Sequence, residues 1–306
     1  MRWSICIPQF VDDGTFDPAA FRGYLARAEE LGFESGWTQE QVLGASSLLS
    51  PIETMTYAAA CVDRLRLGCV VFVTPLHQPV HLAKSLSSLD QISRGRLEVG
   101  IGTGGRARMF SAFEVDPDVA LVARFNEGLQ VMKALWTEPK VTFEGRFWRL
   151  DGATMEPKPF QKPHPPVWFG GNAPAALRRA VRYGDGFFGA GSTTTAAFAE
   201  QVPVVRQELA EQGRDPGGFR IAKRVYIAAD DDPDRARQRM AAALVRIYGD
   251  FGRRLEPVAL CGTPDECAGG LREVAAAGAE MILLNPLFDQ AEQMERLAAE
   301  VMPQVS

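Results

Sequence analysis

Two glycine-rich segments are the parts of this sequence whose residue types could bind a planar or phosphorylated ligand. The first, Gly102-Thr103-Gly104-Gly105, follows the apolar run RLEVGI and offers one hydroxyl group, that of Thr103. The second, Gly170-Gly171-Asn172, follows VWF and precedes Pro174, which can open a helix. Free backbone N–H groups at a glycine turn before a helix can bind phosphate. An ordinary tight turn also accounts for either segment, so the residues alone leave both interpretations open.

The sequence shows no set of side chains suited to nucleophilic or metal-dependent catalysis. Its three histidines are scattered among prolines and its five cysteines form no CxxC pair, which argues against a metal site. No Ser-His-Asp set, paired-carboxylate set or GxGxxG dinucleotide fingerprint is recognisable. Cys6 and Cys69 fall within apolar runs, which favours buried thiols in a reducing compartment.

Composition argues against two classes of partner. The net charge is −5 with both signs interspersed, so there is no basic footprint for nucleic acid. No apolar run approaches the roughly 18 residues that span a membrane, and the first residues lack a signal-peptide layout. With 306 residues, 46% of them hydrophobic, the chain can form one large α/β barrel or two smaller domains. We therefore expect a cytoplasmic protein that acts on a small molecule.

Eight strand-like segments alternate with helical segments along the chain. The predicted strands are Trp3 to Phe10, Phe33 to Thr38, Leu65 to Thr74, Arg96 to Ile101, Val167 to Phe169, Gly186 to Ala190, Phe219 to Ala229 and Glu280 to Leu284. Helical periodicity predicts helices over Pro18 to Leu31, Pro51 to Cys61, Pro79 to Ser93, Ala120 to Trp136, Pro174 to Tyr183, Ala196 to Gln212, Pro233 to Tyr248 and Ala291 to Met302, with one more ending at Ala277. One unbroken βα series favours a (β/α)8 TIM barrel over a doubly wound sheet. We expect a single domain over residues 1–306.

An insertion at about residues 138–166 follows the fourth predicted strand. The segment VTFEGRFWRL is predicted to form a hairpin that turns at Glu144-Gly145, and EPKPFQKPHPP an extended return. A domain linker is disfavoured because the βα alternation resumes at once. Its aromatic residues could line a substrate lid or simply pack a surface hairpin; they are Phe143, Phe147, Trp148 and Phe160.

The active site of a TIM barrel lies at the C-terminal ends of its strands. Several of these predicted ends are glycine-rich, which suits backbone contact with a planar ligand better than a ring of ionisable groups. The candidates by position are Gln9, Trp37 to Glu40, Val70 to Thr74, Gly102 to Gly105, Gly170 to Asn172 and Gly189 to Ser192.

Four segments resemble the luciferase-like monooxygenase superfamily, whose members are flavin- or deazaflavin-dependent oxidoreductases built on a TIM barrel. They are LDQISRGRLEVGIGTGG, GGNAPAALRRAVRYGDG, RLRLGCVVFVTPLHQP and LGFESGWTQEQV, which together span most of the chain. The resemblance implies a cofactor phosphate at Gly170, Gly171 and Asn172. It also implies a non-proline cis peptide at Val70–Val71 behind the cofactor ring, with Thr103 and Gly104 beside that ring.

The same resemblance nominates residues for chemistry at the second strand's exit. Glu40 and Trp37 are the candidate catalytic residues. Gln41, at the same exit, and Gln9, nominated by its position at the end of the first strand, are the candidate substrate-binding residues. This chain has Glu40-Gln41 where many members show Asp-His. Gly105 stands where deazaflavin-dependent sugar-phosphate dehydrogenases place a glutamate, which argues against that activity. A solvated loop glutamate remains an alternative for Glu40.

The function that the resemblance implies is hydride transfer between a small organic substrate and bound coenzyme F420. A reduced FMN monooxygenase that uses dioxygen is the alternative, and a non-catalytic flavin-binding relative is the second. Thr103 stands where bacterial luciferases carry arginine, which favours the deazaflavin branch. Arg106 and Arg108 could reach a phosphate or acidic tail. Many members dimerise through helices that correspond to Pro51 to Cys61 and Pro79 to Ser93, so we expect a homodimer.

Overall fold

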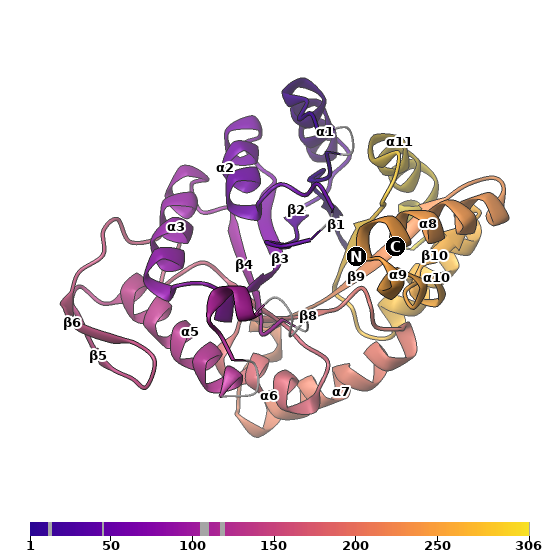
Figure 1. The fold of residues 1–306 in the computed structure, drawn as a ribbon. Helices are drawn as coiled ribbons and strands as arrows, with labels where there is room; N and C mark the ends of the chain where they lie inside the picture. The colour runs from indigo at the N-terminus through magenta and orange to yellow at the C-terminus, as the bar shows by residue number, and fades with distance from the viewer. Residues whose placement is uncertain (12–13, 45, 105–109, 117–119, 306) are drawn as a thin grey trace.

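The computed structural model describes residues 1–11, 14–44, 46–104, 110–116 and 120–305. Eight short, mostly buried, parallel strands form a closed sheet, because β1 pairs with both β2 and β11 and β8 pairs with β9 (Figure 1). These strands are β1 Arg2–Cys6, β2 Ser35–Thr38, β3 Arg66–Val73, β4 Leu97–Gly102, β7 Val167–Gly170, β8 Gly186–Gly189, β9 Arg220–Ala229 and β11 Met281–Asn285. The predicted TIM barrel is confirmed.

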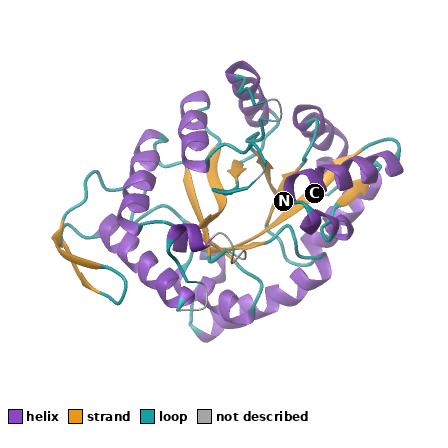
Figure 2. Ribbon diagram, in the orientation of Figure 1, coloured by secondary structure: helices purple, strands orange, loops and turns teal. Residues whose placement is uncertain are grey.

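Amphipathic helices surround the barrel and bury their apolar sides against it (Figure 2). They are α1 Pro18–Glu30, α2 Pro51–Cys61, α3 Pro79–Ile92, α5 Leu121–Thr137, α6 Pro174–Tyr183, α7 Thr195–Glu211, α8 Pro233–Tyr248, α9 Asp250–Arg253, α10 Pro264–Ala276 and α11 Gln290–Arg296. Side chains cap α1, α7, α8 and α10 through Asp17, Thr194, Asp232 and Thr263. In the described part of the chain, none of the helices has the length and apolar character needed to cross a membrane.

Two predicted boundaries differ from the structure, and one strand was not predicted, for local reasons. The first strand ends at Cys6 rather than Phe10, since Pro8 has no N–H to donate to a neighbouring strand. The last helix keeps regular α geometry only to Arg296, after which residues 297–301 form wider π-helical turns. β10, Leu260–Gly262, pairs with β9 outside the barrel series and was not predicted, because three residues are too few to show a pattern.

The predicted hairpin is present as β5, Val141–Glu144, and β6, Arg149–Ala153, and lies outside the helix layer (Figure 1). Trp148 packs near Arg124 of α5, with the guanidinium carbon 4.8 Å from the ring centroid. The extended return is tied to the barrel through Gln161, whose backbone N–H donates to Asp90 at 2.8 Å. None of the described residues of this insertion lines the cavity identified below. The hairpin aromatic residues Phe143, Phe147 and Trp148, and the exposed Phe160 of the return, therefore do not form the wall of that cavity.

A layer of large side chains fills the barrel interior. Trp37, Trp168 and Phe188 contact one another, with the Trp37 and Phe188 ring centroids 4.8 Å apart. The Trp168 indole N–H donates to buried Glu98 at 2.5 Å, and Glu98 also accepts from Arg66. These contacts provide hydrogen-bond partners for the buried indole N–H of Trp168 and the buried carboxylate of Glu98, and so hold the aromatic layer in place.

Candidate active site

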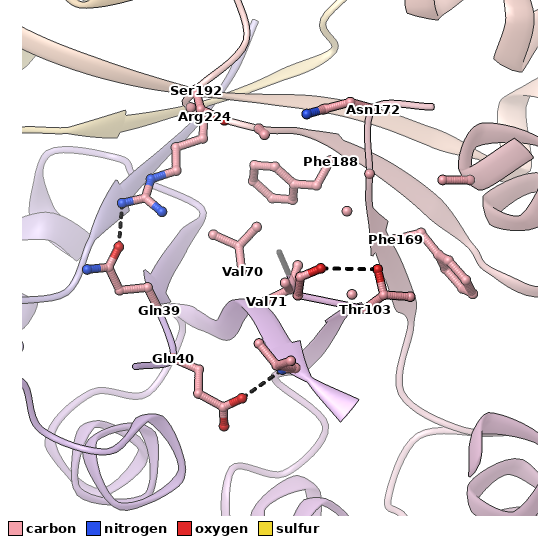
Figure 3. A pocket seen from close by; sticks show the side chains of 18 of the residues that line it. Gln39, Glu40, Val70, Val71, Thr103, Phe169, Asn172, Phe188, Ser192 and Arg224 are labelled. Carbon is pink, nitrogen blue, oxygen red and sulfur yellow. Dashed lines mark hydrogen bonds between the residues drawn. The ribbon is translucent and has the colours of Figure 1, made fainter. Parts of the chain in front are cut away.

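A cavity of about 560 Å³ opens at the C-terminal ends of the barrel strands (Figure 3). Strand ends β3, β4, β7 and β8 supply one side of its lining, and the β2 exit, β9, α8 and α9 supply the other. Its described lining includes Gln39, Glu40, Gln41, Val70, Val71, Thr103, Gly104, Phe169, Gly170, Gly171, Asn172, Arg179, Phe188, Ser192, Arg224, Tyr226, Tyr248 and Phe251. A volume of this size fits a fused-ring cofactor or a drug-sized ligand.

The turn from β7 into α6 presents free backbone donors to this cavity. Ala173 is the N-cap residue of α6 and its side chain caps nothing, unlike the polar caps of α1, α7, α8 and α10. Within the described residues, the N–H groups of Gly171, Asn172 and Ala173 have no acceptor. A helix N-terminus with several free N–H groups attracts an anion, which matches the phosphate role expected of Gly170 to Asn172.

The β3 strand carries a cis peptide bond between Val70 and Val71, as the sequence resemblance implies. The strand's register against β4 shifts between Cys69 and Phe72 at this point. The Val71 side chain lies between two strand ends: a Cβ on Gly102 would be 2.8 Å from Val71 Cγ2, and one on Gly170 would be 3.0 Å from Cγ1. The close approach of Val71 therefore explains why positions 102 and 170 are glycine, whether or not a ligand also contacts them.

Glu40 lies at the cavity with both carboxylate oxygens engaged. The backbone N–H of Val73 donates to one oxygen at 2.7 Å, and His77 Nε2 lies 2.8 Å from the other. The Glu40 side chain is only 3% exposed, whereas that of His77 is 25% exposed. Glu40 is therefore not a solvated loop glutamate. Residue 41 is a glutamine, and the imidazole partner of the Glu40 carboxylate is instead His77, from the turn after β3.

Nine of the eleven nominated residues line the cavity, whereas Trp37 and Gln9 do not line it within the described chain. Trp37 lies behind Phe188 in the barrel interior, with its indole N–H donating to Ser35 at 2.8 Å. Gln9 fixes the β2 exit, because its side chain accepts from Gln39 N–H at 2.6 Å and donates to the Gln39 carbonyl. The candidates Gly105, Arg106 and Arg108 lie outside the described residues.

Sequence reasoning missed the wall formed by β9 and α8. Arg224 and Tyr226 are two residues apart on a strand, so both face the barrel interior. The Tyr226 hydroxyl donates to the Tyr248 hydroxyl at 2.9 Å, and the latter donates to Gln39 Oε1 at 3.1 Å. The available signal was a group of polar residues in the middle of a predicted strand, at positions 223, 224 and 226 of RIAKRVYIAA.

Lys223 donates hydrogen bonds to the loop between β8 and α7. Its Nζ is buried and donates to the carbonyls of Ala190, Thr193 and Arg224, the last two at 2.8 and 3.1 Å. Burial, with a smaller effect from the charge of Arg224, lowers the pKa of Lys223 to about 7. The Thr193 hydroxyl in turn donates to Asn172 Oδ1 at 3.2 Å. The lysine thereby shapes the loop that flanks the α6 N-terminus.

The fold and this cavity define a TIM-barrel protein with a cavity at the strand ends. A family model described as luciferase-like monooxygenase matches residues 1–281. The chain belongs to the luciferase-like monooxygenase family.

The similar proteins differ in the cofactor that is given in their names. The chain is 28% identical over 230 residues to an F420-dependent glucose-6-phosphate dehydrogenase of Kineococcus radiotolerans, covering 72% of this chain and 67% of that one. It is 25% identical over 316 residues to an FMNH(2)-dependent dimethylsulfone monooxygenase of Pseudomonas putida, covering 91% and 85%. The crystal structure of monooxygenase RslO1 from Streptomyces bottropensis superposes with a TM-score of 0.84 at 29% identity and covers 100% of both chains.

Proposed function

We propose that this protein is an oxidoreductase that binds a flavin-type cofactor in the strand-end cavity and acts on a small organic substrate. The observation that carries the proposal is the uncapped N-terminus of α6, whose free N–H groups border the cavity. They suit the phosphate of a cofactor's ribityl chain, since charge-assisted hydrogen bonds contribute about 1.5–3 kcal/mol each. The family membership supports the same class of activity.

The cofactor, when bound, supplies the hydride chemistry, and the chain's own residues supply binding, orientation and proton handling. Val70 and Val71 would offer an apolar surface to the ring of the cofactor, and Thr103 and Gly104 line the same cavity. Glu40 lies where it can hold or move a proton through the carboxylate oxygen next to His77 Nε2. The partly exposed imidazole connects that carboxylate to solvent. Gln41 lines the cavity and remains the candidate for substrate contact.

Coenzyme F420 is the cofactor we propose first, with hydride transfer to or from the substrate. The F420-dependent relative supports it, as does threonine rather than arginine at position 103. Reduced FMN with dioxygen is the second candidate, and it is favoured by similarity over the whole chain to a monooxygenase of known structure. A cytoplasmic location is part of the proposal, supported by the unpaired thiols of all five cysteines.

Parallel titrations of the purified protein with F420 and oxidised FMN test this proposal. We expect micromolar or tighter binding of one cofactor, followed by turnover of that cofactor with a substrate. Tighter binding of FMN together with dioxygen consumption selects the monooxygenase. Binding without turnover selects a non-catalytic relative, and binding of neither cofactor contradicts the proposal.

Two substitutions at the α6 N-terminus locate the phosphate. Ala173→Asp adds a carboxylate cap that should stabilise the helix by about 1 kcal/mol and repel phosphate. We expect an unchanged or higher melting temperature with cofactor affinity reduced at least tenfold. Gly171→Val should also weaken binding, but its Cβ would lie 2.8 Å from Ala176 Cβ, so local disorder of α6 could contribute. Gly23→Val, in open space on α1, is the control that should leave affinity unchanged.

A further inference from the structure

Arg224 is a buried cation on the wall of the cavity. Its side chain extends from β9 and lines the cavity, and the residue is only 9% exposed. Nη2 donates to Gln39 Oε1 at 2.6 Å and to the Tyr248 hydroxyl at 3.4 Å. The guanidinium carbon lies 5.1 Å from the ring centroid of Tyr226. With its amide oxygen turned toward Arg224, Asn285 accepts from Nε at 2.9 Å. These contacts hold the guanidinium group through its Nε and Nη2 atoms.

All of these partners are neutral. In the part of the chain that the structure describes, no carboxylate forms an ion pair with Arg224, and the Nη1 N–H groups have no acceptor. Burying an unpaired charge is costly, so a counter-anion is expected where the guanidinium faces open space. Burial acts to lower the pKa of Arg224, whereas the interactions with Tyr226 and Tyr248 act to raise it. The net shift of the pKa is upward, so the group stays charged.

The described lining of the cavity carries too little negative charge to neutralise it. The lining has one carboxylate, Glu40, against two guanidinium groups, Arg179 and Arg224, which leaves one net positive charge. Glu40 is already engaged by Val73 N–H and His77. An anion that enters the cavity would meet this excess positive charge.

Arg224 and the α6 N-terminus lie at different places around the cavity. In Figure 3 the guanidinium points toward Gln39, on the opposite side of Val70 and Phe188 from Thr103 and Phe169. Arg179 projects from the second turn of α6 and lies near Phe125, 5.9 Å from its ring centroid, so it belongs to the α6 side. A cofactor phosphate at α6 leaves Arg224 for another ligand.

We propose that Arg224 binds the carboxylate of the substrate, which is a small organic acid. This inference rests on the proposed function for the placement of the cofactor. The Nη1 donors offer hydrogen bonds to the carboxylate, while Gln39 and Tyr248 hold the guanidinium in place. Tyr226, Tyr248 and Phe251 provide apolar surface for the body of the acid. The site therefore selects acids over neutral molecules of the same shape.

Benzoate and its neutral isostere benzamide are the probes for a calorimetric titration of the full chain. We expect benzoate to bind the wild-type protein at least tenfold more tightly than benzamide. Arg224→Gln should remove that difference, Arg224→Lys should retain part of it, and Arg179→Gln should leave it intact. The wild-type comparison needs no variant, so it remains decisive if Arg224→Gln unfolds.

Equal affinity for the two probes, or a preference that survives in folded Arg224→Gln, overturns the carboxylate site. Loss of the preference in Arg179→Gln places the anion at α6 and overturns the Arg224 site too.

Measuring the FMN and F420 affinities of the same proteins separates this inference from the proposed function. Unchanged cofactor affinity in Arg224→Gln supports a substrate site, whereas lost cofactor affinity assigns Arg224 to the cofactor and contradicts it. Benzoate preference with no cofactor binding in the wild type keeps the anion site and rejects the proposed function.

Discussion

Glu40 and His77 form the one carboxylate–imidazole pair at the described cavity, joined by a 2.8 Å contact. The carboxylate is fixed by a second contact, to the backbone N–H of Val73, so it cannot rotate freely. An imidazole in this position can pass a proton between a buried carboxylate and water. The pair is therefore the proton carrier that we propose for the site, beside the redox chemistry that the proposed cofactor would supply.

Replacing His77 with alanine should lower turnover without preventing cofactor binding. We expect kcat to fall at least roughly tenfold, less than the 10²–10⁴ typical of losing the proton-transferring group itself. Added imidazole should restore part of the rate, which a purely structural defect would not allow. His81→Ala on the exposed side of α3 is the matched control. An unchanged kcat in His77→Ala would falsify the relay.

The loop between β8 and α7 is the element whose shape depends on a single buried side chain. Lys223 satisfies the Ala190 and Thr193 carbonyls, and the loop contributes Ser192 to the cavity. Loss of the amine would leave the Thr193 carbonyl without this donor, at about 1–3 kcal/mol, whereas the Ala190 carbonyl would keep the Thr193 N–H at 3.1 Å. The same loop contacts Asn172 through Thr193, so its disorder should reach the proposed phosphate site.

The ionisation of Lys223 makes the stability of this element depend on pH. Its pKa is lowered to about 7 in the fold, whereas a lysine in the unfolded chain titrates near 10.4. Between these values the unfolded state holds one more proton, so this group makes stability rise with pH, by at most about 1.4 kcal/mol per unit. Below pH 7 both states are protonated and the slope disappears.

Urea unfolding of wild type and Lys223→Met from pH 6 to 9.5 measures this effect. We expect the variant to be less stable throughout, and the difference between the two proteins to widen above pH 7. Lys140→Met, at an exposed position, should give a curve parallel to that of the wild type. Parallel curves for Lys223→Met would show that the amine does not titrate in this range.

The whole molecule presents α2 and α3 side by side on the outside of the barrel, beside β2, β3 and β4 (Figure 1). We expect these helices to form a dimer interface, as the family resemblance implies. Sedimentation at micromolar concentration should give twice the monomer mass. Ala60→Arg, on the exposed side of α2, should yield monomers because it places a charge in the interface, and Ala199→Arg on α7 should not. A monomeric wild-type protein contradicts this expectation.

The sequence by itself determined the barrel and the position of the cavity at its strand ends. Strands buried on both faces must be apolar and helices that cover them must be amphipathic, so short apolar runs between segments of helical periodicity marked all eight barrel strands. The glycines at 102, 170 and 171 were also visible, because close backbone approach leaves no room for a side chain.

Only the tertiary structure decided which side chains meet at that site. Glu40 and His77 are 37 residues apart, and Arg224 and Gln39 are 185 apart, so their pairing depends on strand register and barrel closure. Trp37 and Gln9 stand at predicted strand ends, yet one faces the interior layer and the other fixes a loop. A linear pattern records burial and turns, whereas contacts between side chains of distant strands arise only when the sheet closes.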